Sequence, residues 1–127
     1  MKIVLDTNVI VSALLIPVSL PAKILETVLK RRAVIVYDNR ILTEYIDVLF
    51  RDKFKIDKTQ INLLLDFIKK EGEFIFADPI IFSFTDEADK KFYEVYKSGM
   101  AQYLITGNIK HFPKEAGIVT PGKFLAS

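Results

Sequence analysis

Two kinds of hydrophobic pattern alternate along this chain. Short continuous apolar runs, which are typical of buried strands, occupy residues 2–6, 33–37, 74–76, 103–106 and 118–120. Between them, apolar residues recur every three or four positions, which predicts helices at residues 9–15, 20–31, 38–49, 57–70 and 86–97. Strands that alternate with helices form a parallel sheet covered on both faces. The pattern therefore predicts an α/β fold, a three-layer α/β/α sandwich with a central, mainly parallel sheet.

Composition narrows the class of protein. The 127 residues are 50% hydrophobic and 27% charged, which suits one globular domain over residues 1–127. Cysteine is absent, so disulfides and thiolate metal sites are excluded. No apolar run approaches the roughly 20 residues of a membrane span, so we expect a soluble, cytoplasmic protein with no membrane partner. The net charge of +2 does not by itself indicate nucleic acid, and the pair Lys90 and Lys91 is typical of a solvated helix face.

An aspartate directly follows the first predicted strand. A buried, unpaired carboxylate is costly, so Asp6 is expected where the strand ends and the chain emerges. In open parallel sheets the carboxyl ends of the strands form the crevice that binds ligands, which makes Asp6 a candidate site residue. The run Asp6, Thr7, Asn8 is also typical of a helix N-cap, and caps are commoner than catalytic acids. These residues alone favour the cap, with the site as the alternative.

Two further acids lie at the border between the apolar and polar faces of their helices. Glu44 lies about a quarter turn from the centre of its apolar face, and Asp89 lies beside its apolar face near the helix start. Each helix begins beyond the top of a strand, so Asp6, Glu44 and Asp89 could converge above one sheet edge. Taken singly, Glu44 and Asp89 are explained by acidic charge that opposes the helix macrodipole. Convergence of all three favours a site.

The fourth predicted strand also ends in polar residues. Thr106 is followed by Gly107, which allows a tight turn, and by Asn108, which offers an amide oxygen. His111 is the only histidine. Taken alone, Asn108 is more often a turn residue, and a lone histidine is more often a surface or packing residue than a base or ligand.

Together these motifs resemble the PIN domain family. The resemblance rests on Asp6-Thr7-Asn8 with Ser12, on Glu44, on the stretch from Asp89 to Pro113, and on the closing residues 120–125. It covers nearly the whole chain. The nearest subgroup consists of small stand-alone PIN proteins described as toxin components of toxin–antitoxin systems, similar to VapC toxins.

The resemblance implies a metal-dependent endoribonuclease that holds Mg²⁺ or Mn²⁺. It implies that the catalytic residues are Asp6, Glu44 and Asp89, and that they bind the metal together with Asn108. It gives supporting positions to Thr7, Asn8, Ser12, Thr106 and His111. It also implies an RNA substrate, an antitoxin partner and a homodimer. Residues 80–84 and the helix from residue 20 offer apolar surface for such contacts, although core burial accounts for most of it.

The sequence departs from fuller relatives at two positions. Gln102 and Asn108 stand where many relatives carry acids, and both changes remove negative charge. The three remaining carboxylates suffice for one firmly held divalent cation and weaken the case for a second. The chemistry fits these residues, because Mg²⁺ prefers oxygen ligands, relieves repulsion between carboxylates, and lowers the pKa of its water for attack on a phosphodiester.

Other classes of protein have similar layers. A phosphotransfer receiver domain needs an acidic pair after the first strand, where this chain has Asp6 alone. A haloacid-dehalogenase-type phosphatase needs a second aspartate where this chain has Asn8. The alternative that stays open is a catalytically degenerate module that binds RNA or a protein partner without cleavage, for which Gln102 and Asn108 argue. The three acids favour the enzyme.

Overall fold

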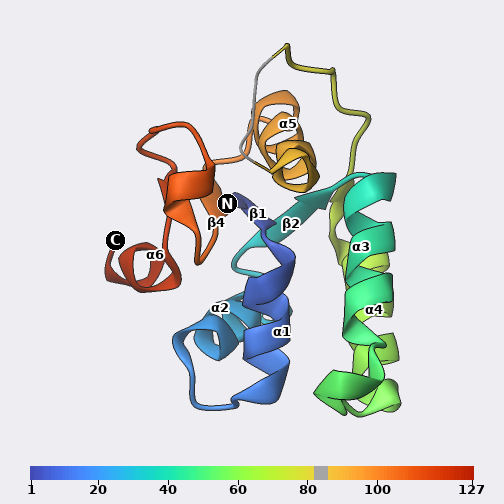
Figure 1. The fold of residues 1–127 in the computed structure, drawn as a ribbon. Helices are drawn as coiled ribbons and strands as arrows, with labels where there is room; N and C mark the ends of the chain where they lie inside the picture. Colours follow the sequence, from blue (N-terminus) through green and yellow to red (C-terminus); the bar gives the residue numbers. More distant parts are fainter. Residues whose placement is uncertain (82–85) are drawn as a thin grey trace.

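The computed structural model describes residues 1–81 and 86–127 and contains one five-stranded sheet (Figure 1). The strand order is β3-β2-β1-β4-β5, and every neighbouring pair is parallel. The strands are β1 (Lys2–Leu5), β2 (Val34–Tyr37), β3 (Glu73–Phe74), β4 (Tyr103–Ile105) and β5 (Ile118–Val119). All five predicted strands are therefore present, although the predicted strand at 74–76 is shorter and starts one residue earlier.

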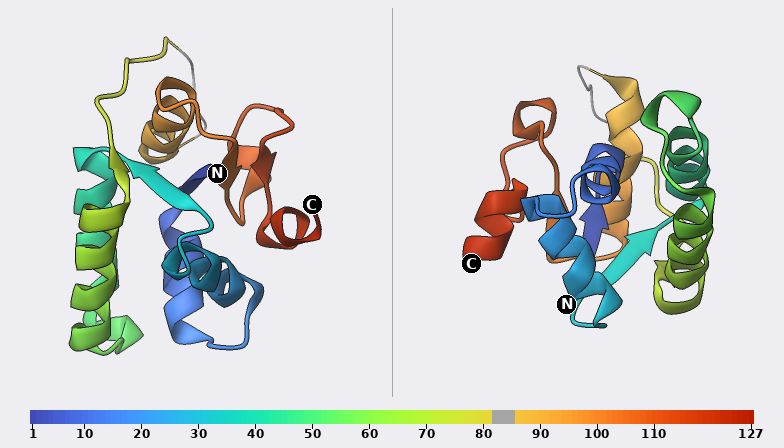
Figure 2. Two further views of the ribbon diagram at one scale, coloured as in Figure 1. Left: turned by 180° about the vertical axis from the view of Figure 1, so that it is seen from behind. Right: turned by 90° about the horizontal axis from the view of Figure 1, so that it is seen from below.

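Helices cover both faces of this sheet (Figures 1 and 2). The α-helices are α1 (Thr7–Leu15), α2 (Leu20–Leu29), α3 (Asn39–Leu49), α4 (Lys58–Glu71), α5 (Lys90–Ser98) and α6 (Pro121–Ala126). Helix α5 packs on β1, β2 and β4 from one side, while α1 and α2 lie on the other side and contact each other. Helix α4 packs against β2, and α3 contacts both α1 and α5. The predicted α/β sandwich with a parallel sheet is confirmed.

Local capping explains where several helices begin. Asp38 accepts a hydrogen bond from the backbone N–H of Ile41 at the start of α3. Thr120 caps α6 in the same way, and Pro121 occupies its first turn, where the missing N–H costs nothing. The sequence analysis predicted a strand at residues 118–120 and no element after it, so it missed α6. A threonine followed by a proline is nevertheless typical of a helix N-terminus.

The segment before α5 differs from the prediction. The predicted helix over 86–97 begins instead as the single 3₁₀ turn η2 (Glu87–Asp89), which Asp86 caps by accepting from the N–H of Ala88. Two further 3₁₀ turns, η1 (Asp52–Phe54) and η3 (Ile109–His111), were not predicted. Of the apolar residues 80–84, positions 82–84 lie outside the described part of the chain, and Ile81 is exposed rather than buried.

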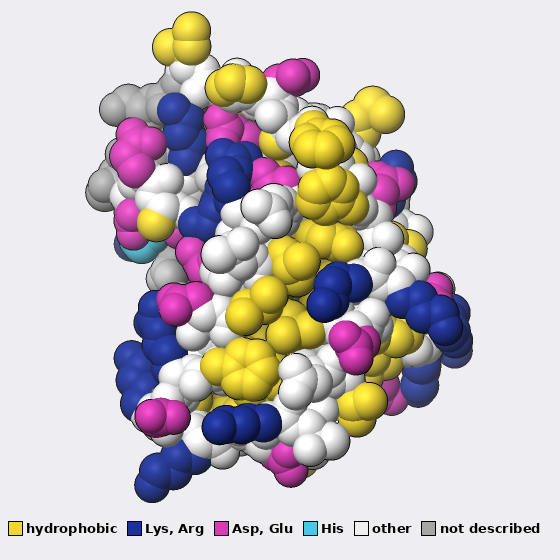
Figure 3. All heavy atoms as spheres, turned by 90° about the vertical axis from the view of Figure 1, so that its right-hand side faces the viewer, with side chains coloured by type: hydrophobic (Ala, Val, Ile, Leu, Met, Phe, Trp, Pro, Cys, Tyr) yellow, Lys and Arg dark blue, Asp and Glu magenta, His cyan; other side chains and the backbone are white. Residues whose placement is uncertain are grey.

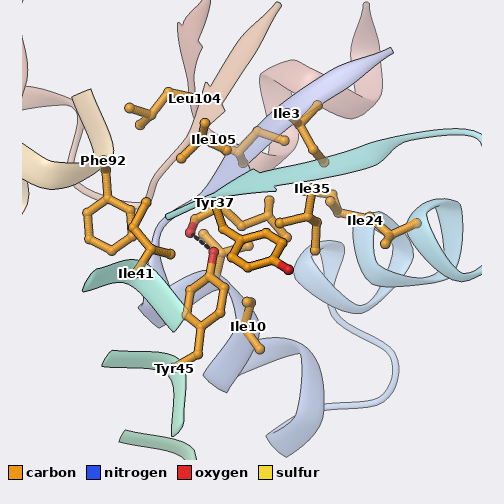
Figure 4. Close-up of a cluster of buried hydrophobic side chains, with 14 of the residues drawn as sticks. Ile3, Ile10, Ile24, Ile35, Tyr37, Ile41, Tyr45, Phe92, Leu104 and Ile105 are labelled. Carbon is orange, nitrogen blue, oxygen red and sulfur yellow. Dashed lines mark hydrogen bonds between the residues drawn. The ribbon is translucent and has the colours of Figure 1, made fainter. Parts of the chain in front are cut away.

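The core lies between the sheet and its helices. Figure 4 shows isoleucines of β1, β2, α1 and α2 in one cluster with Tyr37 of β2 and Tyr45 of α3. The Tyr45 side chain is fully buried, and its hydroxyl donates to the backbone carbonyl of Leu5 at 2.6 Å. Because an unsatisfied buried hydroxyl is costly, this bond fixes where α3 sits against the end of β1.

A second polar contact ties α3 to α5. Arg40 donates to Asp38 at 2.8 Å and to Glu94 at 2.7 Å, and the other oxygen of Glu94 accepts from the backbone N–H of Ile80 at 2.8 Å. Burial alone would raise the pKa of Glu94, but the hydrogen bonds from Arg40 and Ile80 outweigh it and hold that pKa below its ordinary value. Glu94 thus joins three segments while ionised.

Across the described residues, no single helix is long and apolar enough to span a membrane. Helices α1 and α2 are long and apolar enough for a membrane span only when their residues are counted together, and their axes are bent by 99° relative to each other.

We predict that Glu94→Gln lowers the free energy of unfolding by about 1–2 kcal/mol near pH 7, because the buried charge-assisted bond is lost while Arg40 is half exposed. A carboxyl whose pKa is lowered on folding stabilises the fold fully at a pH above its ordinary pKa, which is 4.5 for glutamate. That contribution is lost as the pH falls below 4.5 and through the lowered pKa. The gap between wild type and variant should therefore narrow below about pH 4.5.

Urea unfolding at several pH values measures this gap. Asp47→Asn, which removes a carboxylate from an exposed pair with Arg51, is the control and should change stability little at any pH. If Glu94→Gln lowers the free energy of unfolding by the same amount near pH 7 and near pH 3.5, the charge of Glu94 is not the cause of the loss and the prediction is wrong.

Candidate active site

The carboxyl ends of β1 and β4 bring Asp6 and Thr106 side by side. The backbone N–H of Asp6 donates to the carbonyl of Ile105, and the N–H of Thr106 donates to the carbonyl of Val119, both at 3.0 Å. The parallel ladder therefore continues one residue past each strand. Both side chains are almost fully buried, so this part of the candidate site lies below the protein surface, at the carboxyl ends of the strands.

The Asp6 carboxylate is held by Thr106 and does not cap α1. Asp6 occupies the N-cap position, but its side chain makes no capping hydrogen bond. Instead, the Thr106 hydroxyl donates to Oδ2 of Asp6 at 2.8 Å and accepts from the backbone N–H of Asn108 at 3.0 Å. Asp6 is therefore the N-cap residue of α1 by position, as the cap interpretation expected, but its carboxylate is held mainly by Thr106 and only weakly by the backbone of Asn8.

The protein around Asp6 disfavours its charge. Burial raises the pKa of this carboxyl, the hydrogen bond from Thr106 lowers it in part, and the negative charges of Asp89 and Glu44 raise it again. The net result is a raised pKa. A buried acid that is destabilised by two neighbouring acids is typical of a functional site rather than of a structural ion pair.

Glu44 comes from the first half of α3 and is partly buried. The Thr7 hydroxyl donates to Oε2, and the ammonium of Lys91 lies 2.7 Å from Oε1. Thr7 belongs to the first turn of α1 and Lys91 to the first turn of α5, so three helix segments meet at this carboxylate. The Lys91 side chain is only 13% exposed, which corrects the prediction of a solvated helix face.

Asp89 lies at the end of η2, directly before α5. Its Oδ2 lies 3.0 Å from Nδ1 of His111, which belongs to the 3₁₀ turn after β4. Burial raises the pKa of Asp89, the hydrogen bond with His111 lowers it, and the charge of Asp86 raises it, with a net upward shift. His111 therefore contacts a candidate acid, although a lone histidine gave little reason to expect this.

The remaining predicted positions contribute less direct contacts. Asn108 is exposed and bonds through its backbone to Thr106, while Asn8 is exposed and Ser12 is half buried in α1. Gln102 is exposed just before β4, and its backbone N–H donates to the carbonyl of Lys2. The structure thus brings Asp6, Glu44 and Asp89 into one electrostatic neighbourhood and leaves the amide side chains at its margin.

The donor atoms of this neighbourhood suit a hard cation. Asp6, Glu44 and Asp89 all offer carboxylate oxygens, and their mutual repulsion is what a divalent cation relieves. In the described part of the chain, however, no three Asp, Glu or His side chains are arranged around a common point that could hold a metal. Each acid is turned toward a protein donor instead: Thr106, Thr7 with Lys91, or His111.

Two residues near these acids have properties that the sequence did not indicate. Lys91 was taken for a surface charge because its neighbour Lys90 has the same character, and only the packing of α5 against α3 shows its pairing with Glu44. Tyr45 lies in the core, where burial and the nearby charges of Asp6 and Glu44 raise its pKa well above the ordinary value. Tyr45 therefore stays a neutral donor to Leu5.

An open groove adjoins Glu44 on the surface of α3. Its lining combines the cations Arg40 and Lys91 with Asn39, Thr43, Glu44 and Asp47. The groove carries charges of both signs, which suits a polar polymer better than an apolar ligand.

Comparison with protein families gives one match: the model of the PIN domain family matches residues 2–110. This stretch runs from β1 through Asn108 and includes all three acids. Searches of curated proteins and of solved structures gave no significant match.

We predict that Asp6→Asn raises the free energy of unfolding by roughly 1 kcal/mol near pH 7 in the presence of a chelator. An acid whose pKa is raised on folding is destabilising once it is ionised, so this cost appears as the pH rises above the ordinary value of 3.8. Asparagine keeps an oxygen that can accept from Thr106, so the variant loses the charge but not the hydrogen bond. Because the cost comes from the ionised carboxylate, the gain in stability of Asp6→Asn should disappear below about pH 3.8.

Thermal or urea unfolding with EDTA present tests this expectation. Asp38→Asn is the matched control, because Asp38 is also a buried acid but is paired with Arg40, and its change should lower stability. If Asp6→Asn lowers the free energy of unfolding as much as Asp38→Asn does, then the Asp6 carboxylate stabilises the folded state and the prediction is wrong.

Proposed function

Because the chain belongs to the PIN domain family, whose members are generally nucleases, we propose that it is a metal-dependent endoribonuclease that hydrolyses RNA phosphodiester bonds with a metal-activated water. The observation that carries the proposal is the placement of Asp6: it is only 5% exposed at the end of β1, and it lies near enough to Asp89 and Glu44 for their charges to raise its pKa. A buried acid at the carboxyl end of a parallel strand, with two further acids beside it, is best explained by a ligand that needs them.

The chain offers oxygen donors and residues that orient them. Asp6, Glu44 and Asp89, with the amide of Asn108, would hold Mg²⁺ or Mn²⁺. When bound, the cation supplies Lewis-acid activation of water and neutralises charge on the phosphate.

Supporting residues fix the acids. Thr106 orients the Asp6 carboxylate, Thr7 orients that of Glu44, and His111 orients that of Asp89. Asn8 and Ser12 complete the motif at the start of α1. Hydroxyl and imidazole donors of this kind hold metal-binding carboxylates in place in many proteins.

The substrate would lie along the mixed-charge groove beside Glu44. Arg40 is about half exposed there and can approach a phosphate while it remains bound to Asp38 and Glu94. Such contacts with the RNA backbone carry affinity without sequence preference and weaken with added salt.

The proposal extends to a toxin of a toxin–antitoxin pair, formed by one domain over residues 1–127, cytoplasmic and homodimeric, with a protein antitoxin. Figure 3 shows hydrophobic side chains gathered on the side of the molecule that carries α3 and α4. These helices expose Ile46 and Leu63, and an apolar groove lies between α4 and the pair α1 and α2. Apolar surface of this kind supports a protein partner rather than RNA. A neighbouring gene for a small DNA-binding protein with a disordered tail would favour the toxin role.

We predict that the purified protein cleaves RNA only with Mg²⁺ or Mn²⁺ present, and that Asp6→Asn lowers the rate by about 100-fold or more because a charged oxygen donor is lost. The measurement is cleavage of a panel of structured and single-stranded RNAs with added metal or with EDTA. Asp66→Asn makes the same chemical change on an exposed part of α4 and should leave the rate unchanged.

The alternative proposal is a degenerate PIN-fold module that binds RNA or a protein partner without cleaving it. It is favoured by the bonds that turn each acid toward a protein donor and by the neutral residues Gln102 and Asn108. RNA that is bound but left intact by both wild type and Asp6→Asn would overturn the nuclease and support this module.

A further inference from the structure

A recess with a basic rim lies at the C-terminal end of α3, where the chain passes through η1 into α4. It has a volume of about 190 Å³. The apolar part of its lining is buried or half-buried and consists of Leu49, Phe50 and Ile56. The charged part is exposed and consists of Arg51, Asp52, Lys55 and Lys58. With three cations and one acid, this basic recess carries a net charge of +2.

Two of the three cations are not neutralised by the described part of the chain. Arg51 lies 3.0 Å from Asp47, whereas neither Lys55 nor Lys58 forms an ion pair with a described residue. The carboxylate of Asp57, between these two lysines in the sequence, is engaged as the side-chain cap of α4. Because neighbouring cations repel one another, an anion in the basic recess would be held by their combined charge.

The backbone of Lys55 indicates that this lysine is not required by the turn. Its φ of 51° and ψ of 36° lie in the left-handed region, which glycine adopts freely and asparagine more readily than most other residues. A lysine in this conformation is strained, and strain of this kind is concentrated at functional sites. We therefore expect the exposed side chain of Lys55 to serve a contact outside the fold.

The basic recess is joined to the groove beside Glu44. Arg40, Glu44, Asp47 and Arg51 are spaced by four, three and four residues, so they follow one face of α3. The groove is lined by Asp47 and the basic recess by Arg51, and the contact between these two residues connects them. From Glu44 to Arg51 a helix advances roughly 10 Å. A phosphate in the basic recess would therefore belong to a different nucleotide from one beside Glu44.

Resting on the proposed function, we propose that Arg51, Lys55 and Lys58 form a second binding site for RNA, which holds a backbone phosphate beyond the C-terminal end of α3. RNA is favoured over an acidic peptide or an anionic membrane because the groove leads into the basic recess, so one strand reaches both. Contacts with phosphate add affinity without sequence preference. The site therefore favours RNA strands that are long enough to extend along α3.

The test is binding of a labelled single-stranded RNA of about 20 nucleotides, longer than the site of a typical single-strand-binding domain. Fluorescence anisotropy in EDTA measures binding without metal-dependent cleavage. The double variant Lys55→Asn with Lys58→Gln removes both unpaired ammonium groups. We expect its dissociation constant to rise about tenfold, and the slope of log affinity against log salt concentration to become shallower by about one.

Stability separates this effect from unfolding. Asparagine suits the left-handed backbone at position 55, so the double variant should be at least as stable to urea as wild type. Lys58→Gln alone leaves that turn untouched and should raise the dissociation constant about threefold. This single variant repeats the test if the double variant does not fold.

Lys69→Gln with Lys70→Gln is the matched control. It removes two exposed ammonium groups from the opposite end of α4, and it should change the dissociation constant less than about threefold. An equal loss of affinity in the two double variants would overturn the second site and leave the nuclease standing. Unchanged RNA binding with lost binding to phosphatidylserine vesicles would overturn it in favour of a membrane surface. No RNA binding by wild type would overturn the proposed RNA substrate as well.

Discussion

The hydrogen bond from Thr106 to Asp6 holds a carboxylate where the fold alone would not keep one. It joins residues 100 positions apart in the sequence, and it exists because β1 and β4 are neighbours in a parallel sheet. Without this donor, a carboxylate of 5% exposure beside two other acids would lose its main hydrogen bond and keep only a weaker one from the backbone of Asn8. The arrangement therefore preserves an electrostatically unfavourable group at the edge of a sheet that is otherwise built of apolar side chains.

The other acids depend on the same packing. Helix α3 is positioned by the buried bond from Tyr45 to Leu5, the residue just before Asp6, and by the contact of Arg40 with Glu94 of α5. These contacts set α3 against β1 and α5, so Glu44 and Lys91 meet. The same layer of contacts that forms the core thus also fixes the distances within the group of acids.

Much of the fold could be predicted because each strand is a short apolar run and each long helix has an apolar stripe. The prediction failed where the signal was local or weak: at α6, whose cap and proline were taken for the end of a strand, and at η2, where three acids precede the helical stripe. Sequence position also indicated that Asp6, Glu44 and Asp89 could come together. It could not indicate the partner of each acid, because the pairings with Thr106, Lys91 and His111 depend on contacts between distant segments.

We propose that the acids around Asp6 form a metal site. His111 is the only histidine and contacts Asp89, so its ring protons give a unique reporter beside those acids in a proton NMR spectrum. If the claim is correct, a small fraction of an equivalent of Mn²⁺ broadens the His111 signals of wild type and leaves those of Asp6→Asn sharp. Signals of wild type that stay sharp with a full equivalent of Mn²⁺ would contradict the claim.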